Sequence, residues 1–159
     1  MRPKRKLPLL MRFPPPFLFV LTFLTGYGLQ RALGLSYAAS ELPRGLASLG
    51  WVLVGGGGVF VLSNVVRFAI VRTTIIPHRR SSKLLVTGFY RITRNPMYLG
   101  MSLIFVGVAA LKGAFLPLLL LPIPVLIMDR VFIPFEEGHL REAFGKQFDD
   151  YTRRVRRWI

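Results

Sequence analysis

Two stretches of the chain combine charged and aromatic side chains in patterns that could bind a ligand. The first covers residues 84–100 and reads LLVTGFYRITRNPMYLG. Asn95 and Pro96 predict a helix start, because an Asn side chain can cap a helix and proline fits its first turn. Such a start presents free amide groups and the positive end of the helix dipole, which together favour an anion. Basic side chains and tyrosines surround it: Tyr90, Arg91, Arg94 and Tyr98.

The second stretch is the C-terminal tail from Glu136, which carries five of the seven acidic residues. Its apolar side chains recur at the spacing of one helical face: Leu140, Phe144, Phe148, Tyr151 and Val155. On the other face, acidic residues precede basic ones by four positions: Glu137–Arg141, Glu142–Lys146, Asp149–Arg153 and Asp150–Arg154. We therefore predict one amphipathic helix on the membrane surface or against the membrane helices. Its carboxylates, beside an arginine-rich segment, could equally bind a polar ligand.

Both stretches also have purely structural interpretations. Arginines and tyrosines at residues 84–100 are typical of a membrane boundary with its aromatic belt, and an acidic helix start stabilises the helix dipole. The sequence lacks cysteine and has only two histidines, His78 and His139. It therefore excludes a disulfide scaffold, thiol nucleophiles and Cys-ligated zinc, and we expect no metal site.

Long apolar segments must position these stretches, and a helix needs about 20 apolar residues to cross a bilayer. Four long apolar segments are present, of which the first two approach this length: residues 17–35, 46–66, 97–111 and 113–128. Since the last two are short, we predict a helical hairpin that turns at Lys112 and Gly113. Prolines predict a bend in its second arm: Pro117, Pro122 and Pro124. The expected fold is all-α, with about four transmembrane helices followed by the C-terminal amphipathic helix at the cytoplasmic face.

The distribution of charge sets the orientation of these helices. The chain is 52% hydrophobic with a net charge of +15, and its charges lie in blocks between the apolar segments, as a bilayer requires. Four spans would leave 19 of the 22 lysines and arginines on one side. By the positive-inside rule that side is the cytoplasm, so both termini are predicted to be cytoplasmic. The expected partner of the basic face is the lipid bilayer, with no nucleic acid.

A run of four glycines, residues 55–58, lies within the second apolar segment. A Gly-rich loop can bind phosphate, but the Lys-Ser/Thr that such a loop requires does not follow here. Close packing against another helix is the favoured interpretation. The first apolar segment lacks the cleavage site of a signal peptide, and a short chain without sorting signals is typical of a prokaryotic inner-membrane protein.

The run TGFYRITRNPMYLG, an apolar hairpin and the run FEEGHLREAFGKQFDDYTRRV follow one another in the C-terminal half. Their order and spacing resemble the isoprenylcysteine carboxyl methyltransferase and phospholipid methyltransferase superfamily of integral membrane enzymes. Members carry G-P-Y-R-x-x-R-H-P-x-Y-x-G, a hairpin and E-E-x-x-L-x-x-x-F-G-x-x-Y-x-x-Y. The resemblance implies one membrane domain over residues 1–159, with two spans in 1–71 and a cofactor-binding methyltransferase core in 72–159.

This resemblance implies a methyltransferase that uses S-adenosylmethionine at the cytoplasmic face and takes a lipophilic acceptor from the bilayer. The acceptor would be an isoprenylcysteine-like carboxylate, a phospholipid amine or another hydrophobic nucleophile. Carried over by position, the cofactor-binding residues would be Leu84, Leu85, Val86, Tyr90, Asn95, Pro96, Met97, Tyr98 and Glu137. Arg94 and Glu137 would be catalytic, and Arg94 with Arg130 would bind the substrate.

The chain departs from the superfamily pattern at several positions. Asn95 replaces the usual His, Phe89 replaces Pro, and Phe148 replaces the first tail tyrosine. An Asn still caps a helix and donates a hydrogen bond, so the cofactor assignment is retained. Two alternatives stay open. One is an NADPH-binding reductase related to the C-terminal half of membrane sterol reductases, and the other is a non-catalytic membrane protein with a basic lipid-binding face.

Overall fold

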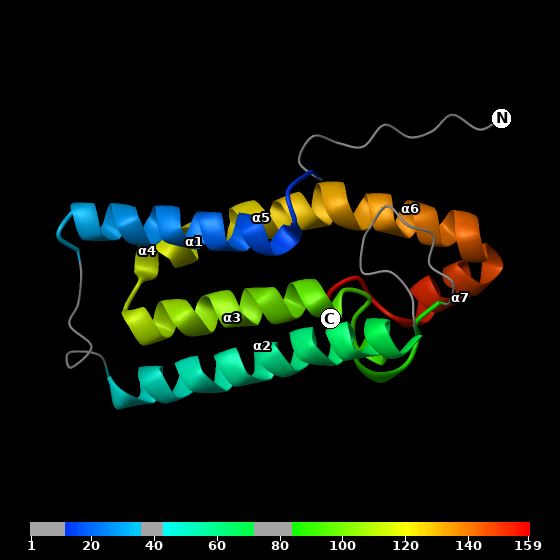
Figure 1. Ribbon diagram of the computed structural model, residues 1–159, viewed down its shortest axis with the longest axis horizontal. Helices are drawn as coiled ribbons and strands as arrows, with labels where there is room; N and C mark the ends of the chain where they lie inside the picture. Colours follow the sequence, from blue (N-terminus) through cyan, green and yellow to red (C-terminus); the bar gives the residue numbers. More distant parts are fainter. Residues whose placement is uncertain (1–11, 36–42, 72–83) are drawn as a thin grey trace.

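The computed structural model describes residues 12–35, 43–71 and 84–159, and all regular elements in these ranges are helical. The first part comprises α1 (Pro15–Ala32), α2 (Arg44–Val71), the 3₁₀ turn η3 (Gly88–Arg91) and α3 (Pro96–Lys112). A longer helical run follows: α4 (Phe115–Leu120), α5 (Pro122–Ile127), the π-helical turn η4 (Met128–Phe132) and α6 (Ile133–Phe144). The last helix is α7 (Lys146–Arg154). Figure 1 shows α2 beside α3, and α1 beside α4 and α5.

The four apolar segments predicted from the sequence are helical in the structure, with ends that differ by a few residues. Among the described residues, two helical segments are long and apolar enough to cross a membrane: the 24 residues of Arg44–Arg67 and the 30 residues of Phe115–Phe144. The second is longer than predicted, because the helix continues through η4 into α6 instead of ending at residue 128. Helix α3 is apolar but shorter, so the count of four spans stays a prediction.

The prolines divide the second arm of the hairpin, as predicted. Helix α4 ends at Leu120 and α5 begins at Pro122, because proline lacks an N–H group and its ring crowds the preceding turn. Helix α1 packs against this arm at a glycine. A Cβ atom on Gly26 would lie 2.8 Å from the Cα atom of Pro117, so only a residue without a side chain allows this approach.

Helices α2 and α3 approach closely because glycines face each other at two levels. A Cβ atom on Gly57 would lie 2.6 Å from the carbonyl oxygen of Gly100, and one on Gly107 would lie 2.7 Å from that of Gly50. The glycines are seven residues apart on each helix, which is about two turns, so one face of each helix forms the contact. In the predicted glycine run, only Gly57 packs in this way. The other three have open space around them: Gly55, Gly56 and Gly58.

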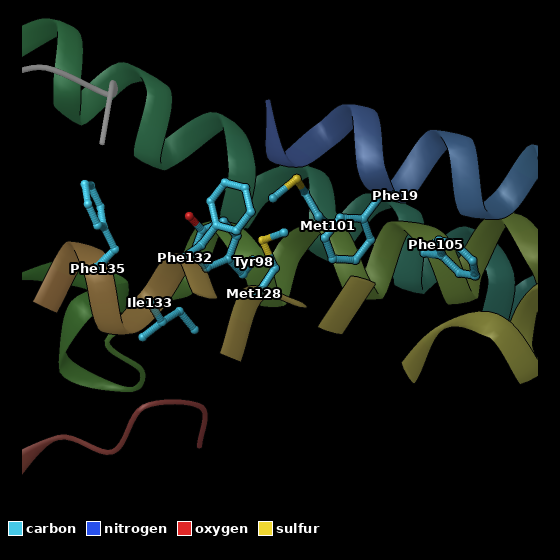
Figure 2. Close-up of a cluster of buried hydrophobic side chains, with 8 residues drawn as sticks. All are labelled: Phe19, Tyr98, Met101, Phe105, Met128, Phe132, Ile133 and Phe135. Carbon is cyan, nitrogen blue, oxygen red and sulfur yellow. The ribbon is translucent and has the colours of Figure 1, made fainter. Parts of the chain in front are cut away.

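A cluster of buried side chains joins α1, α3, η4 and α6. Figure 2 shows its members: Phe19, Tyr98, Met101, Phe105, Met128, Phe132, Ile133 and Phe135. Phe105 of α3 contacts Phe19 and Phe23 of α1 edge to face, with ring centroids 6.3 and 5.2 Å apart. Because close-packed side chains fit together in few arrangements, the cluster fixes α6 relative to the start of α3.

The prediction of one continuous tail helix is wrong. Gly145, with a φ of +49°, separates α6 from α7, because glycine tolerates a positive φ that other residues avoid. The turn brings Arg141 Nε within 2.9 Å of Asp149 Oδ1, so Arg141 does not pair with Glu137 as predicted. Asp150 likewise pairs with Arg153, at 3.7 Å, instead of the residue four positions on.

Replacing Gly57 with Ala should separate α2 from α3, because the added Cβ atom would collide with the backbone of Gly100. Overpacking of this kind costs about 1–3 kcal/mol of stability, and we expect a clear fall in the melting temperature of the protein in detergent. Gly56→Ala is the matched control, since nothing lies within 4 Å of its Cβ position and alanine favours a helix. Equal melting temperatures for the two variants would contradict the glycine contact.

Candidate functional site

The segment before α3 is fixed to the end of α2. Arg67 of α2 donates from Nη1 to the carbonyl oxygen of Thr87 at 2.9 Å and also to its hydroxyl. Gly88 has a φ of +65°, and a Cβ atom there would lie 2.8 Å from the Arg67 guanidinium, so this position requires glycine. Phe89 stacks on Phe60 with ring centroids 4.1 Å apart. These contacts hold η3 and the residues after it beside the start of α3.

Helix α3 begins with a proline, as predicted, but the Asn95 side chain does not cap it. Instead, the side-chain amide of Asn95 donates to the carbonyl oxygen of Arg157 at 2.9 Å. The Thr93 hydroxyl donates to the same oxygen at 3.0 Å, and the Arg94 amide donates to the carbonyl oxygen of Arg156 at 3.0 Å. The predicted cap is wrong because the C-terminal tail lies against the start of α3 and engages the Asn95 side chain.

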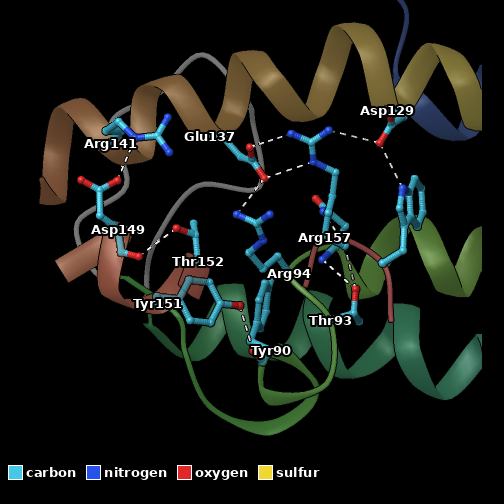
Figure 3. A network of polar contacts seen from close by, with 12 residues as sticks. Tyr90, Thr93, Arg94, Asp129, Glu137, Arg141, Asp149, Tyr151, Thr152 and Arg157 are labelled. Carbon is cyan, nitrogen blue, oxygen red and sulfur yellow. Dashed lines mark hydrogen bonds and ion pairs between the residues drawn. The ribbon is translucent and has the colours of Figure 1, made fainter. Parts of the chain in front are cut away.

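Glu137 of α6 lies between two arginines from distant parts of the chain (Figure 3). Arg94 Nη1 lies 3.2 Å from Glu137 Oε1. Arg157 contacts both carboxylate oxygens, with Nη2 2.9 Å from Oε2 and Nε 3.4 Å from Oε1. The remaining nitrogen, Nη1, lies 3.3 Å from Asp129 Oδ1, which also accepts a hydrogen bond from the Trp158 indole at 3.0 Å. One charge network thus joins the start of α3, η4, α6 and the tail.

This charge network is partly shielded from water. The side chains of Arg94 and Glu137 are 15% and 13% exposed, so both charges need partners. The hydrogen bond to Glu137 raises the pKa of Arg157, and its guanidinium therefore stays charged. Glu137 is engaged by two guanidinium groups, whereas Arg94 Nε is buried without a hydrogen-bond partner among the described residues. Arg94 Nε is thus a buried donor that no described residue engages.

The neighbouring carboxylate, Glu136, has a different partner. The Tyr98 hydroxyl donates to Glu136 Oε1 at 2.5 Å, and Tyr98 is buried. Burial, and then the charge of Glu136, raise the pKa of Tyr90, so this tyrosine stays neutral and can donate a hydrogen bond. Tyr151 of α7 donates its hydroxyl to the carbonyl oxygen of Tyr90 at 2.8 Å. The structure thus brings both predicted tyrosines and both tail glutamates to the start of α3.

A second unpartnered polar atom lies on α2. Asn64 is 1% exposed, its Nδ2 donates to the carbonyl oxygen of Phe60, and its Oδ1 is buried without a partner in the described part of the chain. Asn64 follows Gly57 by seven residues, so it lies on the α2 face that packs against α3. Because Gly57 faces Gly100 and the two helices are antiparallel, Asn64 lies level with the segment that precedes α3.

The predicted binding residues outside the network lie in different environments. Leu84 and Leu85 are half-buried, whereas Val86 is exposed. Met97 packs against the buried cluster of Figure 2. Arg130 pairs with the aspartate before it, at 3.4 Å, but its side chain is 79% exposed. It therefore lies at the edge of the network, whereas Arg94 lies at its centre.

Four residues of the site were not predicted from the sequence: Asn64, Asp129, Arg157 and Trp158. Arg157 and Trp158 belong to a basic run at the end of the chain, where no local pattern distinguishes one arginine from another. The signal for Asn64 is stronger. It is an amide within an otherwise apolar segment, and polar side chains in membrane helices commonly have a functional role.

The unpaired groups of the site are complementary to a ligand that carries both an anionic group and hydrogen-bond donors. In the described part of the chain no side chain caps α3, and its first amide groups, with the nearby Arg94 Nε, are donors suited to an anion. Asn64 Oδ1 is available to an ammonium group or a hydroxyl. Within residues 12–35, 43–71 and 84–159, no three His, Cys, Asp or Glu side chains gather as metal ligands.

Comparison with known proteins identifies a family and a relative to which the chain is similar. The model of the phospholipid methyltransferase family matches residues 46–147, a range that contains α3, α6 and most of α2. Protein-S-isoprenylcysteine O-methyltransferase B of Arabidopsis thaliana is 28% identical over 119 residues, and the chain spans about 60% of the length of that protein. The match covers 70% of this chain, and no solved structure matches it. Since the family model covers more than half of its residues, the chain belongs to the phospholipid methyltransferase family.

Proposed function

We propose that this chain is a membrane methyltransferase that uses S-adenosylmethionine to methylate a lipophilic acceptor. The observation that carries the proposal is the approach of Arg94, with its unused Nε donor, to the α6 glutamates inside the range matched by the family. The names of the family and of the Arabidopsis relative support methyl transfer. The acceptor would be an isoprenylcysteine-like carboxylate, a phospholipid amine or another hydrophobic nucleophile.

The unused polar groups of the site fit S-adenosylmethionine. The uncapped start of α3 would bind its carboxylate, and Asn64 Oδ1 with the α6 glutamates would accept hydrogen bonds from its ammonium group and hydroxyls. The residues assigned to the cofactor remain Leu84, Leu85, Val86, Tyr90, Asn95, Pro96, Met97, Tyr98 and Glu137. When bound, the cofactor supplies a sulfonium methyl group. The acceptor's electron pair would form the new bond to this methyl group, and the electrons of the broken C–S bond would stay on sulfur.

The protein's main tasks in such a reaction are to align the two partners and to exclude water. Arg94 would orient an anionic group of the acceptor through its Nε donor, while Glu137 holds the other end of the guanidinium. Arg130, at the exposed edge of the network, would contact the acceptor as it enters the site. A carboxylate or thiolate acceptor needs no general base, whereas a protonated amine would need one of the α6 glutamates.

We further propose that the chain has four spans and that the site lies at the cytoplasmic membrane surface. The end of α2, the start of α3, α6 and α7 lie at the same end of the molecule (Figure 1). The positive-inside rule assigns this end, with its many arginines, to the cytoplasm. Helices α2, α4 and α5 expose apolar side chains suited to lipid: Trp51, Val52, Leu62, Leu119, Ile123 and Leu126.

Replacing Glu137 with Gln should weaken the binding of S-adenosylmethionine to the purified full chain. A hydrogen bond to a charged group is worth about 1.5–3 kcal/mol, which corresponds to a tenfold to roughly hundredfold loss of affinity. Calorimetric titration in detergent measures the change, and Glu142→Gln, an exposed position on the same helix, is the matched control. Undiminished binding in Glu137→Gln, or a wild-type chain that prefers NADPH, would contradict the proposed site.

Replacing Arg94 with Ala should lower turnover by roughly 100-fold, the usual effect of removing one oriented charge-stabilising donor. The affinity for S-adenosylmethionine should change little, because the proposal assigns Arg94 Nε to the acceptor. Transfer of a tritiated methyl group into lipids of a total membrane extract measures turnover. Arg91→Ala, an exposed arginine in η3, should behave as wild type, and full activity in Arg94→Ala would exclude the assigned role.

A further inference from the structure

The last five residues, 155–159, follow α7 and complete the charge network. Helix α7 ends at Val155, whose backbone is extended with a φ of −123° and a ψ of 129°. The carbonyl oxygens of Arg156 and Arg157 then accept hydrogen bonds from the three residues that precede α3: Thr93, Arg94 and Asn95. The Trp158 ring packs against the buried cluster of Figure 2. Backbone and side chains therefore both hold this segment against the site.

The two arginines of the network use their nitrogen atoms differently. All three nitrogens of Arg157 lie within 3.4 Å of carboxylate oxygens of Glu137 or Asp129. Arg94 contacts Glu137 through Nη1, and its Nε has no partner among the described residues. Every nitrogen atom of Arg157 is therefore engaged by a carboxylate, whereas the Nε donor of Arg94 is left for a ligand. The bidentate contact also makes Arg157 the stronger constraint on the Glu137 carboxylate.

We propose that Arg157 is a positioning residue, which holds Glu137 in the orientation that leaves Arg94 Nε free for the methyl acceptor. This inference rests on the proposed function of Arg94. Without Arg157, Glu137 would have Arg94 as its remaining charged partner, and a guanidinium beside one carboxylate favours a bidentate contact. Arg157 makes that contact through Nε and Nη2, and Arg94, already bound through Nη1, would make it through Nε and Nη1. Arg94 Nε would then donate to Glu137 and would no longer be available to the acceptor. Residue 157 lies outside the matched range 46–147, so family membership alone does not assign this role.

Steady-state kinetics of the full chain in detergent, with a tritiated methyl donor and a total lipid extract, tests the role of Arg157. Arg157→Gln should lower kcat about tenfold to hundredfold, the loss seen when residues that orient metal ligands are replaced, with a smaller change in the affinity for the donor. Arg157→Lys should recover part of the loss, because an ammonium group keeps the charge but not the planar fork. Arg153→Gln is the matched control, since the Arg153 side chain is 80% exposed.

A double-mutant cycle separates positioning from a general structural effect. If Arg157 acts through Arg94, Arg157→Gln should cause little further loss in an Arg94→Lys background, whereas independent effects would multiply. If Arg157→Gln does not fold, the same cycle is measured with Arg157→Lys, which tests whether the two effects multiply. Wild-type kcat in the Arg157 variants, or losses that multiply, would overturn the inference while leaving the proposed function intact. A wild-type chain that neither binds nor uses the donor would overturn both.

Discussion

A charged carboxylate that is shielded from water must be neutralised, and this requirement at Glu137 organises the functional half of the molecule. Its two cationic partners, Arg94 and Arg157, precede α3 and follow α7, so segments far apart in sequence must meet at one point of α6. Removing one partner of such a pair is costly because it leaves a charge without compensation. The network thus ties the tail, the start of α3 and α6 together, and among the described residues it leaves Arg94 Nε without a partner.

Helix packing places the partners of this network within reach of each other. The facing glycines let α2 and α3 approach until backbone atoms nearly touch, and this contact brings the end of α2 to the segment before α3. Arg67 and Phe60 of α2 then hold that segment through Thr87 and Phe89. On the other side of α3, the buried cluster fixes η4 and α6. The position of Arg94 therefore depends on contacts from both sides of α3.

Much of the fold could be predicted because it follows from local patterns. Apolar segments of helical length, a proline at the start of α3 and prolines in the second arm each act through neighbouring residues. The tail was harder to predict, since its apolar spacing and its charge pairs fit one continuous helix as well as they fit two. One glycine, Gly145, breaks that helix, and the resulting turn gives Arg141 a partner in α7 in place of Glu137. A pattern of spacings does not indicate where a single glycine will turn the chain.

The same distinction applies to the site. The residues of the motif at 84–100 and the glutamates of α6 could be identified by type and order, and the structure brings Arg94 and Glu137 into contact. The partners Asp129, Arg157 and Trp158 depend on long-range packing of the tail, which no local pattern reports. The failure of the predicted Asn95 cap has the same cause, because its competitor is a carbonyl group 62 residues away.

The most direct test of the central claim is photochemical cross-linking of radiolabelled S-adenosylmethionine to the purified full chain, with the labelled peptides identified by mass spectrometry. We expect label on peptides from residues 84–100 or from α6, and loss of that label when S-adenosylhomocysteine, but not NADPH, is in excess. Label confined to other parts of the chain, or label that S-adenosylhomocysteine does not displace, would contradict a methyl-donor site built around Arg94 and Glu137.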